Sequence, residues 1–138
     1  MDNQPQVYTL DEVNDLIPTL NEVLPQLREL REQIASEKDK HDVEELTSHG
    51  TTGEAAEKSK KKMDEHKRKI VIHEDEFERM LRIFHDIGCV LRSLDPGLVD
   101  FYSHMNDELV FLCWKEGEED VRFWHGLNEG YDGRQPIL

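Results

Sequence analysis

The sequence has little cysteine and no long apolar run. Its 138 residues include two cysteines, Cys89 and Cys113, and the chain shows no basic-then-apolar leader, so neither a disulfide framework nor secretion is expected. No apolar stretch approaches the roughly 20 residues that a membrane-spanning helix needs. We therefore expect a soluble protein of the reducing cytoplasm.

Basic charge is also scarce. The chain has 17 lysines and arginines against 31 aspartates and glutamates, a formal net charge of −14, and such a surface repels phosphate backbones and anionic lipids. The basic stretch KSKKKMDEHKRK at residues 58–69 is interpreted as the solvated side of a helix. We expect no nucleic-acid or membrane partner, and the length suits a single domain over residues 1–138.

A capping box predicts where the first helix begins. Thr9 and Glu12 are spaced so that each side chain can satisfy a free backbone N–H at a helix start, which predicts a helix over residues 10–37. Its apolar residues recur every three or four positions and share one face: Val13, Leu16, Leu20, Val23, Leu27, Leu30 and Ile34. Pro18 and Pro25 lie off that face and each removes a backbone hydrogen bond, so we expect the helix to be bent or broken.

A second periodic run predicts another long helix. The period fades over residues 38–60, where Gly50 and Gly53 favour a polar connection. It returns over residues 61–94 in two apolar rows: Met63, Ile70, Phe77, Phe84 and Leu91, with His73, Met80, Ile87 and Leu94 beside them. Pro96 disfavours helical geometry at the residue before it, so the helix should stop there.

The pattern then changes to a period of two. LVDFYSH, ELVFLCWK and VRFWHG indicate three short strands within residues 98–126. Asn106-Asp107 suits a two-residue hairpin turn and Gly117 marks the next turn. Residues 127–138 should lie against the sheet as an irregular tail that holds Arg134 near Glu118 and closes one side of the His125 cluster. The predicted fold is α+β, a long antiparallel helical hairpin followed by a three-stranded antiparallel β-meander.

Three strands cannot cover the apolar stripes of two long helices. We expect a homo-oligomer in which the helices pack on those of a second chain as a four-helix arrangement. The alternative is a monomer whose sheet folds back over its helices.

GLVDFYS, LCWKEGE, WH and GRQPI occur in this order after an acidic helical half, and YTLDEVNDLIPTL precedes them. With these motifs the chain resembles the prokaryotic domain of unknown function 2203 over nearly its whole length. The resemblance implies no assigned activity, although some members carry a provisional label connecting them with metal ions. The turn Asn106-Asp107 departs from the Asn-Gly of the family. The matching positions are Gly97, Asp100, Phe101, Cys113, Trp114, Gly117, Glu118, Trp124, His125, Gly133, Arg134 and Gln135.

The two turns set a register across the three strands. It opposes two rows of residues: Phe101, Leu112 and Trp124 in one, and Tyr102, Phe111 and His125 in the other. Because side chains alternate between faces, the core side should hold Phe101, Ser103, Val110, Leu112, Trp114 and Trp124. The other side collects Asp100, Cys113 and His125, which are near enough to reach a common ion or substrate atom.

Three interpretations of that side stay open. A metal site would use His125, a carboxylate and a further ligand, and such donors suit zinc or iron better than calcium. Its candidate ligands are His125, Asp100, Glu118, Cys113, Glu129 and His104. A nucleophilic site would use Cys113 as thiolate, His125 as base and Asp100 to orient it. In the third interpretation Cys113 is a small buried hydrophobe and His125 hydrogen-bonds at the sheet edge.

The sequence therefore predicts an uncharacterised protein that binds a transition-metal ion near His125. The alternative from another class is a homo-oligomeric interaction module without small-molecule chemistry, and a Cys/His-dependent enzyme is a third possibility.

Arg134 could bind either an external carboxylate or phosphate or the protein's own Glu118, and the acidity of the chain favours the internal pair.

Overall fold

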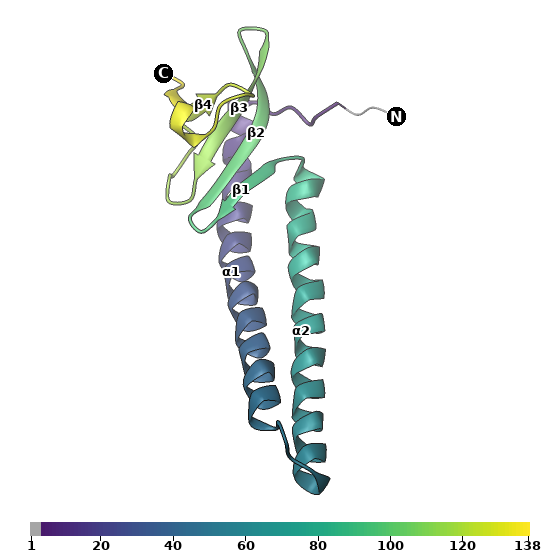
Figure 1. Ribbon diagram of the computed structural model, residues 1–138. Helices are drawn as coiled ribbons and strands as arrows, with labels where there is room; N and C mark the ends of the chain where they lie inside the picture. Colours follow the sequence, from purple (N-terminus) through teal and green to yellow (C-terminus); the bar gives the residue numbers. More distant parts are fainter. Residues whose placement is uncertain (1–3) are drawn as a thin grey trace. The chain divides into compact units, whose positions relative to one another are not determined.

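The computed structural model of the chain describes residues 4–138 and consists of two long helices followed by an antiparallel sheet (Figure 1). Its elements are α1 (Leu10–Thr47), α2 (Gly53–Ile87), β1 (Val90–Leu94), β2 (Gly97–Met105), β3 (Glu108–Lys115), β4 (Phe123–His125), a 3₁₀ turn (Tyr131–Gly133) and β5 (Gln135–Pro136). The strands lie in the order β1-β2-β3-β4-β5. The predicted helical hairpin followed by antiparallel strands is confirmed, but the sheet has five strands and not three.

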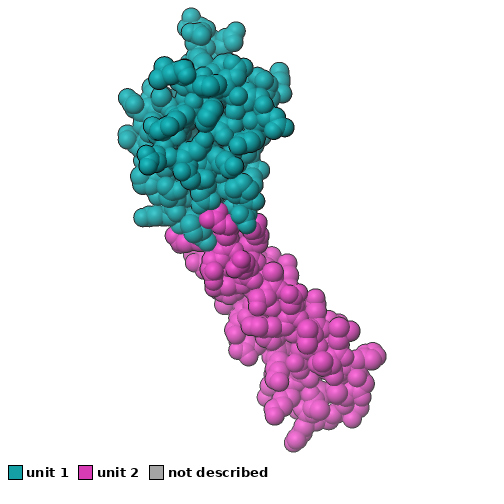
Figure 2. All heavy atoms as spheres, turned by 90° about the vertical axis from the view of Figure 1, so that its left-hand side faces the viewer, with its two compact units in different colours: residues 1–25, 81–138 teal, residues 26–80 magenta. Residues whose placement is uncertain are grey.

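The chain forms two compact units, which Figure 2 colours separately. The first consists of the described residues up to Pro25 together with Leu81–Leu138, so it holds the sheet, the start of α1 and the end of α2. The second is Gln26–Met80, the remainder of the helical hairpin. Among residues 4–138, neither helix combines the length and the apolarity that a membrane crossing requires.

The start of α1 is the predicted capping box. The Thr9 N–H donates to Glu12 Oε1 at 2.9 Å, and the Glu12 N–H donates to Thr9 Oγ1 at 3.2 Å. The helix then continues unbroken through Pro18 and Pro25, so of the expected bend or break, the break is wrong and the bend stays a prediction. Both prolines are exposed, and there the carbonyl groups that lose a helical partner can bond to water.

The helices extend further toward their connection than predicted. The connection expected over residues 38–60 is limited to residues 48–52. Polar residues with good helix propensity, chiefly Glu and Lys, fill the rest of that range. The loss of regularly spaced apolar residues therefore indicated a more solvated part of the helices and not their ends.

At its other end α2 is shorter than predicted, because it stops at Ile87 and not at residue 94. Gly88 has a φ of 83°, and the Cys89 N–H donates to the Phe84 carbonyl at 3.2 Å, which is the hydrogen bond of a Schellman helix end. The chain then enters β1. Leu91 and Leu94 kept the helical spacing of the preceding apolar residues although they belong to a strand.

The register of the central strands agrees with the prediction. Phe101 pairs with Leu112, which pairs with Trp124, and Tyr102 pairs with Phe111, which pairs with His125. The hairpin turn between β2 and β3 is formed by Asn106 and Asp107, with φ values of 54° and 66°. Positive φ at both positions is the type I′ geometry that matches the strand twist, so this turn holds the register.

The tail was predicted to be irregular, but part of it is regular. It forms the 3₁₀ turn and then β5, in which Gln135 pairs with Trp124 and Pro136 pairs with Phe123. Proline argues against a central strand because it cannot donate to the ladder, but it is tolerated on an edge strand, which β5 is. The tail therefore extends the sheet beside β4.

The first unit contains most of the buried apolar residues. In Figure 1 the start of α1 passes behind the strands, and the Asn14 side chain accepts a hydrogen bond from the Val121 N–H at 2.8 Å. The buried apolar side chains of this unit are Val13, Ile17, Leu20, Val23, Leu24, Phe84, Cys89, Val99, Phe101, Val110, Phe111, Leu112, Cys113, Trp114 and Val121. Much of the apolar stripe of α1 is thus covered within the chain.

Candidate metal centre

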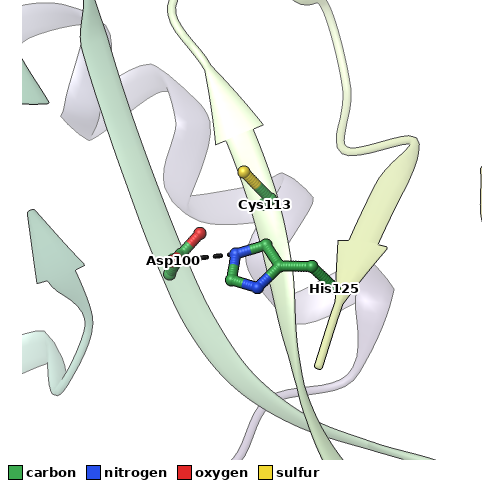
Figure 3. A group of neighbouring side chains, drawn as sticks. All are labelled: Asp100, Cys113 and His125. Carbon is green, nitrogen blue, oxygen red and sulfur yellow. Dashed lines mark hydrogen bonds and ion pairs between the residues drawn. The ribbon is translucent and has the colours of Figure 1, made fainter. Parts of the chain in front are cut away.

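Asp100, Cys113 and His125 come from β2, β3 and β4 and point toward one another (Figure 3). Asp100 pairs directly with Cys113 across the β2–β3 ladder, and His125 reaches them from the next strand. One ligand atom from each residue lies within 4.8 Å of the other two. The three residues are 1%, 0% and 1% exposed respectively, so both faces of the sheet are buried here and not only the core face.

The two oxygens of the Asp100 carboxylate differ in their contacts. Its Oδ2 lies 3.0 Å from His125 Nε2 and accepts a hydrogen bond from Arg92 Nε at 2.8 Å. Its Oδ1 is buried and has no hydrogen-bond partner. A buried carboxylate oxygen without a partner is costly, so Oδ1 has an unmet capacity to bind a donor or a cation.

The His125 ring is held from its other side. Its Nδ1 lies 2.8 Å from the carbonyl oxygen of Gly126, and because a carbonyl can only accept, Nδ1 carries the proton. Nε2 then faces the Asp100–Cys113 side. A backbone carbonyl that fixes the imidazole in this manner is the usual support for a histidine that binds metal through its other nitrogen.

The Cys113 thiol is not activated as a nucleophile. Burial raises its pKa to about 12, and the nearby Asp100 carboxylate acts in the same direction. A thiolate is the reactive form, so this environment disfavours nucleophilic chemistry by the free thiol at neutral pH. A cation bound beside the sulfur would have the opposite effect on the thiol.

Glu118 does not join the three residues. Its two carboxylate oxygens accept hydrogen bonds from Arg134 Nη2 at 2.9 and 2.8 Å, and its Oε1 also accepts from the Lys115 N–H. The predicted internal pair of Arg134 with Glu118 is therefore confirmed. Of the other candidates, Glu129 accepts from the Gly126 N–H and His104 is exposed.

Arg92 and Arg134 border the group, and sequence reasoning missed the first of them. Arg92 was placed on the second helix, whereas it lies on β1 and contacts Asp100 and the ring of Phe111. Gly88 was the available signal, because a glycine just after a periodic run is a common helix end.

A family model described as "Uncharacterized conserved protein (DUF2203)" matches residues 6–137, which is nearly the whole chain. No curated protein and no solved structure matches the chain. The description assigns no activity.

Proposed function

The chain belongs to the DUF2203 family of uncharacterized conserved proteins, and we propose that it binds a divalent transition-metal ion through Asp100, Cys113 and His125. The observation that carries the proposal is the buried Oδ1 of Asp100, which has no hydrogen-bond partner although a thiol and an imidazole lie beside it. A cation is the partner that all three of these groups have in common.

The donor set indicates which ion fits. Imidazole nitrogen, thiolate sulfur and one carboxylate oxygen suit zinc or iron, whereas calcium and magnesium prefer oxygen donors only. Three protein donors leave one tetrahedral position for water or another ligand. Glu118, which the sequence also suggested as a ligand, is engaged by Arg134 and is not included.

The role of each residue follows from its contacts. Asp100 would offer Oδ1 while its Oδ2 remains bonded to Arg92, and His125 would offer Nε2 while Nδ1 donates to Gly126. Cys113 would bind as the thiolate. The ion would join three neighbouring strands and could act as a Lewis acid toward a ligand at its open position.

The free thiols of Cys89 and Cys113 fit a reducing cytoplasm, which we propose as the location of the protein.

The test is elemental analysis of the full chain after purification without a metal-affinity tag. The proposal expects about one transition-metal ion per chain, and raised thermal stability when zinc, iron, manganese or nickel is added. Binding only the folded state stabilises it by about 2.7 kcal/mol when the free ion is at a hundred times the Kd. No metal after purification, with no thermal shift for any of the four ions, would refute the proposal.

The chain offers a matched control for this test. Cys113→Ala removes one proposed ligand and should abolish the zinc-dependent shift. Cys89→Ala removes the other buried cysteine, which lies in the same unit but outside the three-residue group, and should keep the shift. Equal loss of the shift in both variants would point to general destabilisation and not to a lost ligand.

A second candidate function is a homo-oligomeric interaction module that assembles through its helices. It is supported by large apolar side chains that are exposed on the second unit: Val43, Leu46, Val71 and Ile72. A second copy of the chain is the proposed cover. Light scattering that finds only monomer at tens of micromolar would remove this candidate, and it would leave the metal proposal unaffected.

A further inference from the structure

Two arginines border the buried group: Arg92 contacts Asp100, and Arg134 lies near the Cys113 carbonyl. Asp100, Cys113 and His125 are almost fully buried, so an ion or a reagent can reach them only if a neighbouring side chain moves. The two bordering side chains differ in how firmly they are held.

Arg134 is held tightly. Its Nη2 donates to both oxygens of Glu118, at 2.9 and 2.8 Å, and its guanidinium carbon lies 4.0 Å from the ring centre of Phe123 and 4.8 Å from that of Tyr131. Its side chain is 9% exposed. Moving it would break a charged pair and two ring contacts, and would leave Glu118 half-buried without its cation.

Arg92 is held more loosely. The register of β1 with β2 shifts between Leu91 and Ser93, so Arg92 is a bulge residue without a paired partner, and a bulge redirects a side chain. Its Nε donates one hydrogen bond to Asp100 Oδ2 at 2.8 Å, and its guanidinium lies 5.1 Å from the ring centre of Phe111. The side chain is 43% exposed, so water can replace its lost hydrogen bond when it swings away.

We infer that Arg92 is the gate of the Asp100–Cys113–His125 group, and that solvent, thiol reagents and metal ions reach the group when its side chain leaves Asp100. Arg134 is the fixed wall. The inference deepens the proposed function and rests on it only for the passage of metal ions, because access of a reagent to Cys113 does not require that an ion be bound.

The first experiment measures how fast N-ethylmaleimide, an uncharged thiol reagent, labels Cys113 in the full chain after treatment with a chelator. Peptide mass spectrometry separates Cys113 from Cys89, which is also buried and serves as an internal reference for global unfolding. Arg92→Ala should label Cys113 about tenfold faster than wild type, with Cys89 unchanged.

Electrostatics cannot produce this result by itself. Removing the Arg92 cation leaves the Asp100 charge less balanced beside the thiol, which disfavours the reactive thiolate and would slow labelling. Acceleration therefore reports access. Unchanged labelling of Cys113 in Arg92→Ala, or equal acceleration of both cysteines, would each overturn the inference. If Arg92→Ala does not fold, Arg92→Lys keeps the charge with a shorter reach and should still label Cys113 faster than wild type.

The second experiment follows the release of zinc from loaded protein to a colorimetric chelator. Arg92→Ala should release zinc faster than wild type by a factor similar to that found for labelling. Failure of the proposed function would appear as no zinc loaded in any variant, while the labelling experiment would still decide the gate. Zinc that loads but leaves both proteins at the same rate would overturn the gate and keep the metal site.

Discussion

His125 and Asp100 face each other across β3, with Nε2 of the imidazole 3.0 Å from Oδ2 of the carboxylate. They belong to β4 and β2, which are not neighbours in the sheet, and both residues are 1% exposed. The carboxylate also accepts from Arg92. Asp100 therefore holds the partly buried Arg92 side chain through its Oδ2 and lies beside Nε2 of the buried His125 ring.

Replacement of Asp100 by alanine should be strongly destabilising. It removes the acceptor of Arg92 and leaves His125 facing an empty space, and a broken buried pair of this kind costs about 3 kcal/mol. Urea unfolding followed by circular dichroism measures the loss, with Asp132→Ala as an exposed control. Asp100→Asn keeps the shape and one acceptor, so it should cost less than Asp100→Ala. A loss below about 1 kcal/mol for the alanine variant would contradict this account.

Two arginines give a matched comparison of buried and exposed ion pairs. Arg134 and Arg122 each bind a carboxylate, Glu118 and Asp120 respectively, but their side chains are 9% and 67% exposed. Arg134→Ala should lower the free energy of unfolding by about 2 kcal/mol, because Glu118 loses its cation and two rings lose their cover. Arg122→Ala should leave it nearly unchanged, because an exposed ion pair contributes little. Equal losses in the two variants would contradict the role given to Arg134 as a wall.

The meeting of Asp100, Cys113 and His125 could be predicted because local signals determine the register. Asn106-Asp107 accepts positive φ at both turn positions and Gly117 closes the next turn, so the alternation of side chains follows without knowledge of the rest of the chain. Three of the six candidate ligands consequently lie together.

The burial of that group could be predicted only in part. The tail was expected to lie against the sheet and to hold Arg134 near Glu118, as it does, but the cover from β1 was not expected. Arg92 lay in what the apolar spacing indicated to be helix, and Arg134 lay in a tail expected to be irregular. Leu91 lies on a strand but continues the apolar spacing of the helix by coincidence. Gly88 was the one local signal that the helix ends before it. The pairing of Glu118 with Arg134 was predictable from charge. That Glu118 would lie outside the Asp100–Cys113–His125 group was not.

The turn between β2 and β3 offers a stabilising substitution. Asp107 adopts a φ of 66°, which costs a non-glycine residue free energy that glycine does not lose. Asp107→Gly should raise the free energy of unfolding by about 0.5 kcal/mol, and Asp107→Ala should lower it. Thermal unfolding of the two variants measures both effects. If Asp107→Ala is as stable as Asp107→Gly, the positive φ of residue 107 is not retained in solution.

In the second unit, Glu37 and His66 form a contact between the two helices. Glu37 Oε2 lies 2.6 Å from His66 Nδ1, and Glu37 is 8% exposed. The hydrogen bond from His66 lowers the pKa of Glu37 below its ordinary value of 4.5, opposed by partial burial and aided by the charges of Lys40 and Lys69. A carboxyl whose pKa is lower in the folded state releases its proton more readily there than in the unfolded chain.

Glu37 should therefore stabilise the protein above the ordinary glutamate pKa, and the contribution should disappear as the pH falls through the lowered value of the folded state. Denaturant unfolding of wild type and Glu37→Gln across this range checks the sign, since the difference between them should be largest near neutral pH and shrink in acid. Glu57→Gln, an exposed glutamate on α2, provides the control and should give a smaller difference. A difference between wild type and Glu37→Gln that grows as the pH falls would show that the hydrogen bond with His66 does not lower this pKa.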